Sequence, residues 1–247
     1  MIMNKQLIIN ADDFGLTRAV NYGILDAFLN HDISAASLMV NTPATMHAVE
    51  LIKEYQLPVG IHINITLGKP LSSKELVDTL VDKNGCFHKN RYYLDGNHVD
   101  EKQLILEFDR QIEEFVHLIG HLPDHINYHH IYDFYQEYPG LFSHLVRQYH
   151  LPMRLEKDFD NYPFQYFSKQ DLFMDQDGQM DPYLQETYVE LPCHIGYVDD
   201  DLIQISSLNI ARCHDALLAH SQQFKKMYQQ QGYQLVSWKD VKFKGQL

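Results

Sequence analysis

The feature of this sequence that most constrains its fold is the alternation of strand-like and helix-like runs. The strand-like runs lie at residues 6–10, 35–40, 58–63, 123–128, 151–155, 187–192 and 233–237. The helix-like runs lie at about residues 18–30, 43–55, 100–119, 136–149, 170–175 and 207–231. Such alternation is typical of a parallel sheet covered by helices. Because seven strands fall within 247 residues, we predict an α/β fold, a single-domain distorted (β/α) barrel over residues 1–247.

Two long stretches interrupt this alternation. Residues 64–99 follow the third predicted strand, residues 156–186 follow the fifth, and both contain glycine and proline. Loops of this length within a compact domain are usually functional. Both leave from the C-terminal ends of strands, which is the face where barrels carry their active sites. We interpret them as walls of a substrate cleft, with tolerated surface insertions as the alternative.

The composition argues against several kinds of partner. The net charge is −13, whereas nucleic-acid binding needs basic patches. No apolar run approaches the roughly 18 residues that a membrane span needs, and no secretory signal precedes the first strand. The cysteines Cys86, Cys193 and Cys213 are odd in number and none is spaced as CxxC, which favours reduced thiols. We therefore expect a cytoplasmic protein that binds neither nucleic acid nor membrane.

Carboxylates and histidines follow four of the predicted strands. The first strand runs into Asp12 and Asp13, the third ends at His62, the fourth leads to His129, and the sixth leads to His194. Because the carboxyl ends of parallel strands meet at one face of a barrel, we expect these side chains to lie close together. One aspartate with two histidines is a fitting ligand set for a divalent metal with open positions for water and substrate. A turn or capping role for the aspartates, and a structural role for the histidine-rich segment 125–130, are the alternatives.

These residues lie in segments that resemble the YdjC-like carbohydrate deacetylases, the family that includes chitooligosaccharide deacetylases. The matching segments are residues 9–16, 21–24, 59–62, 67–70, 123–130, 151–154 and 193–194, so they extend over nearly the whole chain. The opening Asn-Ala-Asp-Asp-Phe-Gly, the later Gly-x-His and the histidine cluster form a specific signature together. Each of these elements alone would be weak.

The resemblance implies a deacetylase-type barrel with long loops on its C-terminal face and a divalent metal, Mg²⁺ or Zn²⁺. It implies removal of an N-acetyl group from a small amino-sugar oligosaccharide, chitobiose-like and with or without a phosphate. Matched residue by residue, Asp13, His62 and His129 correspond to the metal ligands. Asp12 corresponds to the general base and His194 to the general acid. A metal activates water and polarises an amide oxygen, and the other two groups handle protons, so this set supplies each part of amide hydrolysis once.

Several assignments stay open at this point. Arg154 corresponds to a strand-end arginine that would orient a carboxylate in catalysis. The roles of Asp12 and Asp13 could be exchanged. His130 competes with His129 as a metal ligand. Asn127 stands where the family commonly has aspartate. An asparagine still accepts a hydrogen bond from a ligand histidine, but it makes that histidine less basic. The acidic residues 199–201 are candidate partners that would favour the charged form of His194. The alternative is that these residues form only a solvated acidic loop.

Two other functions compete with deacetylation. Hydrolysis of a phosphorylated disaccharide would keep the metal, but it would need two carboxylates flanking the glycosidic bond, and Asp12 and Asp13 are adjacent. A non-catalytic sugar-binding protein is the third hypothesis, and Asn127 is its only support in the sequence. In each case we expect a small carbohydrate as the partner and leave a homodimer open.

Overall fold

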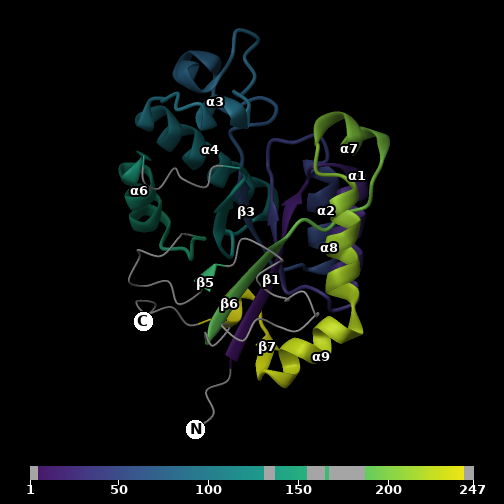
Figure 1. Ribbon diagram of the computed structural model, residues 1–247. Coiled ribbons are helices and arrows are strands. Elements are labelled where there is room, and N and C mark those ends of the chain that lie inside the picture. Colours follow the sequence, from purple (N-terminus) through teal and green to yellow (C-terminus); the bar gives the residue numbers. More distant parts are fainter. Residues whose placement is uncertain (1–4, 131–136, 155–164, 167–186, 242–247) are drawn as a thin grey trace.

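A computed structural model describes residues 5–130, 137–154, 165–166 and 187–241 (Figure 1). Its strands are β1 (Lys5–Phe14), β2 (Ala35–Leu38), β3 (Val59–Ile63), β4 (Ile126–Tyr128), β5 (Gln165–Tyr166), β6 (Tyr188–Cys193) and β7 (Tyr233–Leu235). They form one sheet in the order β4-β3-β2-β1-β6-β5, and β7 pairs with the start of β1. All of these pairs are parallel, as the sequence predicts. The strand predicted over 151–155 is present as a parallel bridge from Met153 to Ile126.

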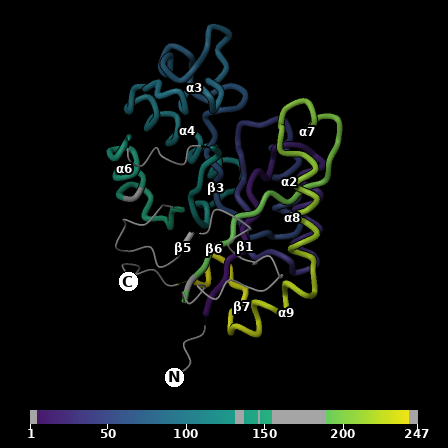
Figure 2. The backbone as a smooth tube through the Cα atoms, viewed as in Figure 1, coloured from purple at the N-terminus to yellow at the C-terminus, as the bar shows by residue number. Residues whose placement is uncertain are grey.

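The helices pack around the outer face of the curved sheet. They are α1 (Arg18–Leu29), α2 (Thr45–Tyr55), α3 (Asn90–Leu94), α4 (Glu101–Ile119), α6 (Pro139–Tyr149), α7 (Asp200–Ile205), α8 (Ile210–His220) and α9 (Gln222–Gln230). Figure 2 shows α2 and α8 on one side of the strands, with α4 and α6 on the other. Among the described residues, no helix is both long and apolar enough to cross a membrane. The helix predicted over 170–175 lies outside the described residues, as does nearly all of the second long loop.

The single helix predicted over 207–231 is wrong, because two helices occupy this range. The α8 helix ends at His220, and α9 begins at Gln222. Between them, the Ser221 side chain accepts a hydrogen bond from the backbone N–H of Phe224 and so caps the start of α9. A serine cap satisfies an N–H that the first turn of a helix otherwise leaves unpaired. This cap makes a new helix start at Gln222 more favourable than continuation of the old one.

The strand residues alternate between an apolar outer face and a largely polar inner face. On β3, Ile61 and Ile63 belong to the main hydrophobic core beneath the helices. On the inner face, buried polar side chains come from neighbouring strands: Asn10, Ser37, His62, Asn127 and Glu190. Alternation of this kind follows from the two-residue period of a strand. The functional residues therefore project from the inner face of the sheet and not from its packed outer face.

A contact across the inner face shows that the sheet is strongly curved. Arg154 follows the bridge beside β4, at one end of the strand order. Its guanidinium nevertheless donates to Asp12 on β1 and to Glu190 on β6. A flat sheet would hold these positions several strand spacings of about 4.8 Å apart. The α/β fold is thus confirmed, and this contact is what a distorted barrel requires.

The first long loop, 64–99, is folded and is fastened to α4. It contains two short 3-10 helices, Lys74–Leu76 and Asp78–Leu80, as well as α3. The buried Glu107 of α4 accepts hydrogen bonds from the backbone N–H groups of Leu71 and Ser72, each at 3.0 Å. The loop therefore has a fixed path from the C-terminal end of β3.

Candidate active site

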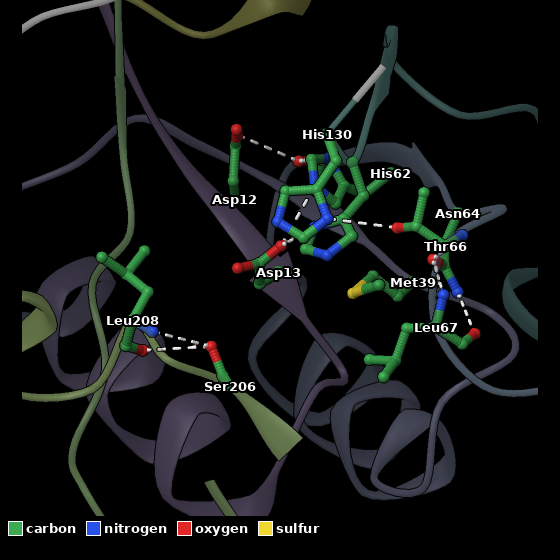
Figure 3. A network of polar contacts seen from close by, with 12 residues as sticks. Asp12, Asp13, Met39, His62, Asn64, Thr66, Leu67, His130, Ser206 and Leu208 are labelled. Atoms are coloured by element: carbon green, nitrogen blue, oxygen red, sulfur yellow. Dashed lines mark hydrogen bonds and ion pairs between the residues drawn. The ribbon is translucent and has the colours of Figure 1, made fainter. Parts of the chain in front are cut away.

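Three buried side chains meet at the C-terminal ends of β1, β3 and β4. The Oδ1 atom of Asp13 lies 3.1 Å from Nε2 of His62 and 2.9 Å from Nδ1 of His129. One ligand atom from each residue can be chosen so that all three lie within 4.8 Å of one another. Figure 3 shows Asp13 and His62 facing each other in this cluster. The three residues that the family resemblance matched to metal ligands are thus brought together.

The backbone of β1 gives Asp13 its direction. The pairing of β1 with β2 shifts register between Ala11 and Phe14, and Asp13 has φ of 68°, in the left-handed region. A bulge of this kind takes a side chain out of the normal alternation. A non-glycine residue with positive φ is uncommon, and such strain often occurs at functional sites. The bulge therefore directs Asp13 toward the two histidines, although Asp12, its neighbour, points into the inner face.

The cluster has the properties expected of a metal site. The Nε2 atom of His62 is buried and makes no hydrogen bond among the described residues, although Oδ1 of Asp13 lies nearby. A buried nitrogen without a hydrogen bond is costly unless another ligand satisfies it. One carboxylate oxygen and two imidazole nitrogens form a donor set for a divalent ion that retains open positions. The residues present therefore fit such an ion.

Burial and neighbouring charges shift the pKa values of the three cluster residues in different directions. Burial tends to raise the pKa of Asp13, but the nearby His129 and Arg212 outweigh it and hold the pKa well below its usual range. Burial lowers the pKa of His129 and outweighs the opposite effect of Asp13, in the direction of the neutral ring that a metal ligand needs. For His62, burial is outweighed by Asp12 and Asp13, which raise its pKa. An ion at this site would compete with a proton on His62.

His130 lies next to the cluster but outside it. Its ring centroid is 3.6 Å from that of His129, while its Nδ1 atom hydrogen-bonds with the Thr66 hydroxyl at 3.1 Å. Its backbone also has positive φ, at 69°, and its side chain is exposed. The three-residue cluster contains His129 and not His130. His130 is thus at the rim, beside the candidate ligand.

Asp12 is enclosed by a network of charged hydrogen bonds. Arg154 donates from Nη1 to Oδ2 at 2.6 Å and from Nη2 to Oδ1 at 2.9 Å. The same guanidinium donates to Glu190 from Nε at 2.8 Å and from Nη2 at 2.6 Å. Burial alone would raise the pKa of Asp12, but Arg154 and His62 outweigh it and hold that pKa far below its usual range. Asp12 is therefore ionised throughout the physiological range of pH.

Asn127 lies between this network and the metal cluster. Its side-chain amide is 2.7 Å from Nδ1 of His62. The amide is best satisfied with its NH₂ group toward His62 and the Ile61 carbonyl, and its oxygen toward Nη2 of Arg154. With the oxygen turned to His62 instead, it would accept the Nδ1 proton and leave the Nε2 lone pair for a metal. A half-turn of this amide therefore selects the tautomer of His62.

His194 is half-buried and lies directly after the C-terminal end of β6. A charge on His194 would lower the pKa of both Asp12 and His129, so its ring lies within electrostatic reach of the cluster. Two of the acidic residues expected to be its partners bond elsewhere, since Asp199 caps α7 and Asp200 accepts from Gln204. The Oδ2 atom of Asp215 accepts a hydrogen bond from the His194 backbone N–H at 2.7 Å.

The sequence analysis missed Arg212 and Asp215, which both come from α8. Arg212 is fully buried, and its Nη2 atom lies 2.6 Å from Oδ2 of Asp13. Neither residue follows a strand in the sequence, because both lie on α8, a helix that reaches the site by packing. The burial of Arg212 appears only in the structure, so no local pattern in the sequence marks it. Glu190 was also missed, although it lies on the predicted sixth strand.

The sequence and the fold of this chain are similar to those of known proteins. A model of the family of YdjC-like proteins matches residues 6–230. A carbohydrate deacetylase of Clostridium beijerinckii is 30% identical, covering 96% of this chain and 100% of its own. A chitooligosaccharide deacetylase of Yersinia pestis is 39% identical over 63% of this chain and 61% of its own. A crystal structure from Enterococcus faecalis V583, provisionally described as a cellobiose-phosphate cleavage protein, has a TM-score of 0.79 at 27% identity and covers 96% of this chain and 98% of its own. Because the family model covers most of its length, this chain belongs to the YdjC-like family.

Proposed function

We propose that this protein is a metal-dependent carbohydrate N-deacetylase. Its substrate would be a small, chitobiose-like amino-sugar oligosaccharide, with or without a phosphate, and its product would include acetate. The observation that carries the proposal is the buried cluster of Asp13, His62 and His129 beside an ionised Asp12. The deacetylase names of the two relatives support the same reaction.

The three-residue cluster would hold the metal. A divalent ion there would lower the pKa of a water molecule and polarise the acetyl oxygen of the substrate. Of the two metals considered, the donor set favours Zn²⁺, because imidazole nitrogens suit zinc whereas Mg²⁺ prefers oxygen ligands. Asp13 would contribute the single negative charge, and the neutral form of His129 would contribute a lone pair.

The other residues would move protons. In the hydrolysis, the water oxygen forms a bond to the acetyl carbon, the carbon–nitrogen bond breaks, and acetate and a free amine result. Asp12 would take the proton of the attacking water, and Arg154 would fix its orientation while keeping it ionised. His194 would give a proton to the leaving nitrogen. Such acid–base help is typically worth about 10²–10⁴-fold in rate.

Hydrolysis of a phosphorylated disaccharide is the alternative, and the Enterococcus faecalis structure is the observation in its favour. That reaction needs a carboxylic acid that stays protonated near neutral pH. Both site aspartates have lowered pKa values, so neither suits that role. A non-catalytic sugar-binding role gains nothing from a buried, charged cluster of this kind. We therefore favour deacetylation.

A direct test is acetate release by chelator-treated protein supplied with Zn²⁺ or Mg²⁺. The substrates would be N,N′-diacetylchitobiose and its phosphorylated form, with new reducing ends measured in parallel. We expect acetate with Zn²⁺ and no new reducing ends. Asp13→Asn should abolish the activity, while Asp95→Asn, at an exposed i,i+4 ion pair, serves as the matched control. Reducing ends without acetate would favour the alternative, and neither product would favour the binding role.

A further inference from the structure

We propose that Arg212 is a positioning residue that makes Asp13 a one-oxygen ligand of the metal, an inference that rests on the proposed metal-dependent function. Arg212 lies on α8, far in sequence from the strands that carry the cluster. It is 1% exposed, and its guanidinium contacts Oδ2 of Asp13, whereas the histidines contact Oδ1. Among the described residues, its hydrogen bonds reach neither of the two ligand nitrogens, so its effect would pass through Asp13.

The guanidinium is held at two points. Its Nε donates to the backbone carbonyl of Leu208, one turn earlier, at 2.8 Å. Its Nη2 donates to Oδ2 of Asp13 at 2.6 Å. The first contact fixes the plane of the guanidinium relative to α8, and the second fixes one oxygen of the carboxylate. Asp13 is therefore tied to a helix that packs on the outside of the sheet.

The two oxygens of Asp13 have different partners. Oδ2 faces Arg212, whereas Oδ1 faces His62 and His129. The carboxylate thus turns a single oxygen toward the place where the other two donor atoms converge. If Oδ2 were released, rotation about the terminal bond of the side chain could present either oxygen, both, or neither. Such rotation is easy for aspartate, because this torsion is broad.

The neighbouring Asp12 provides the contrast within the same molecule. Arg154 engages both of its oxygens in a fork, at 2.6 and 2.9 Å, and so leaves no oxygen of Asp12 without a strong donor. Arg212 engages only one oxygen of Asp13. Two adjacent carboxylates therefore differ in the number of oxygens that an arginine occupies. This difference favours Asp13 over Asp12 as the metal ligand.

A second role for Arg212 would be charge balance alone, and the two roles predict opposite changes in metal affinity. Removal of a nearby cation would strengthen the attraction between Asp13 and a divalent ion. Removal of an orienting partner would weaken binding, because outer partners of metal ligands typically contribute about 10–100-fold in affinity. The sign of the change in affinity therefore separates positioning from charge balance.

The test is calorimetric titration of the chelator-treated protein with Zn²⁺, using Arg212→Gln and Arg212→Lys. Both variants lose the fork of donors, but the lysine variant keeps the charge. We expect the Kd for Zn²⁺ to rise by about 10–100-fold in both variants. Arg110→Gln, which removes an exposed arginine on α4, should bind as the wild type does. Visible absorption of the Co²⁺-loaded proteins should also change in the two Arg212 variants, since it reports on the geometry of the ligands.

Three outcomes would overturn the proposal. Tighter or unchanged Zn²⁺ binding by Arg212→Gln would show that the orientation of Asp13 does not depend on it. Wild-type affinity and an unchanged Co²⁺ spectrum in Arg212→Lys would leave charge balance as the role. Unfolding of both variants, judged by circular dichroism, would make Arg212 a residue of the fold. If Zn²⁺ binding changes as expected but the wild type releases no acetate, the proposed reaction fails while the role of Arg212 stands.

Discussion

Arg154→Gln should destabilise the protein strongly, and the loss should depend on pH. The guanidinium makes two hydrogen bonds to Asp12 and two to Glu190, and all three side chains are at most 6% exposed. Removal of one partner from a buried ion pair typically costs about 3–5 kcal/mol. Because one cation here serves two carboxylates, we expect a loss at the upper end of this range at pH 7. That is a large part of the roughly 5–15 kcal/mol that stabilises a typical domain.

The direction of the pH dependence follows from Asp12. In the wild type, Arg154 holds the pKa of Asp12 well below its ordinary value, so the ion pair stabilises the fold above that ordinary value. This contribution is lost as the pH falls through the lowered pKa. In the variant, burial acts on Asp12 without its main compensating charge, so a proton is taken up at higher pH. The difference in stability between the two proteins should therefore shrink from pH 7 toward pH 4.

Urea unfolding followed by circular dichroism at several pH values would measure this difference. Arg110→Gln is the matched control, because it removes an exposed arginine paired with Glu113 at 3.1 Å. Exposed pairs contribute only about 0–1 kcal/mol, so this control should change little at any pH. A loss for Arg154→Gln below about 1 kcal/mol, or one that stays constant with pH, would refute the reasoning from buried charge.

Three further substitutions test the roles proposed for individual residues. His129→Ala should lose bound metal and acetate release but keep its fold, and full metal content by elemental analysis would contradict the ligand assignment. Asp12→Asn should keep the metal and lose turnover by roughly 10²-fold or more, whereas loss of metal would mean that the two aspartates exchange roles. His194→Ala should slow release of acetate more than release of trifluoroacetate from an activated amide, because a poor leaving amine depends most on the proton. Equal slowing of both substrates would speak against a general acid.

The sequence was sufficient to predict the sheet and which residues meet at its edge. Short apolar runs marked the strands, and the rule that parallel strands end on one face brought Asp13, His62 and His129 together. The rule needs only the positions of the strand ends, and short apolar runs in the sequence mark these directly. The roles of the two aspartates were open because they depend on a bulge and on two arginines that approach from elsewhere. Neither the positive φ of Asp13 nor the fork of Arg154 has a local signature.

The acidic residues near His194 show that closeness in sequence does not decide which carboxylate a residue contacts. Asp199 follows closely, but its carboxylate accepts from the backbone N–H of Leu202 and begins α7. An aspartate just before a helix commonly serves this capping role. Asp215, on the next helix, accepts a hydrogen bond from the backbone N–H of His194. Such a contact depends on how α8 packs against β6, which no short pattern of residues encodes.

The motif Val-Gly-Ile-His in β3 contains one residue that permits close packing, Gly60, and one that lies in the candidate metal site, His62. A Cβ atom added to Gly60 would lie 2.3 Å from Nδ1 of His125, so glycine alone leaves room for that ring. The His125 ring stacks on Trp238, whose cluster with Ile8 forms an apolar layer below the polar network. Because an apolar layer makes an unpaired charge more costly to bury, the charged groups above it depend on their ion pairs, such as those of Arg154 with Asp12 and Glu190. Gly60 therefore shapes the apolar layer, and His62, two residues further on the same face, reaches the candidate metal site.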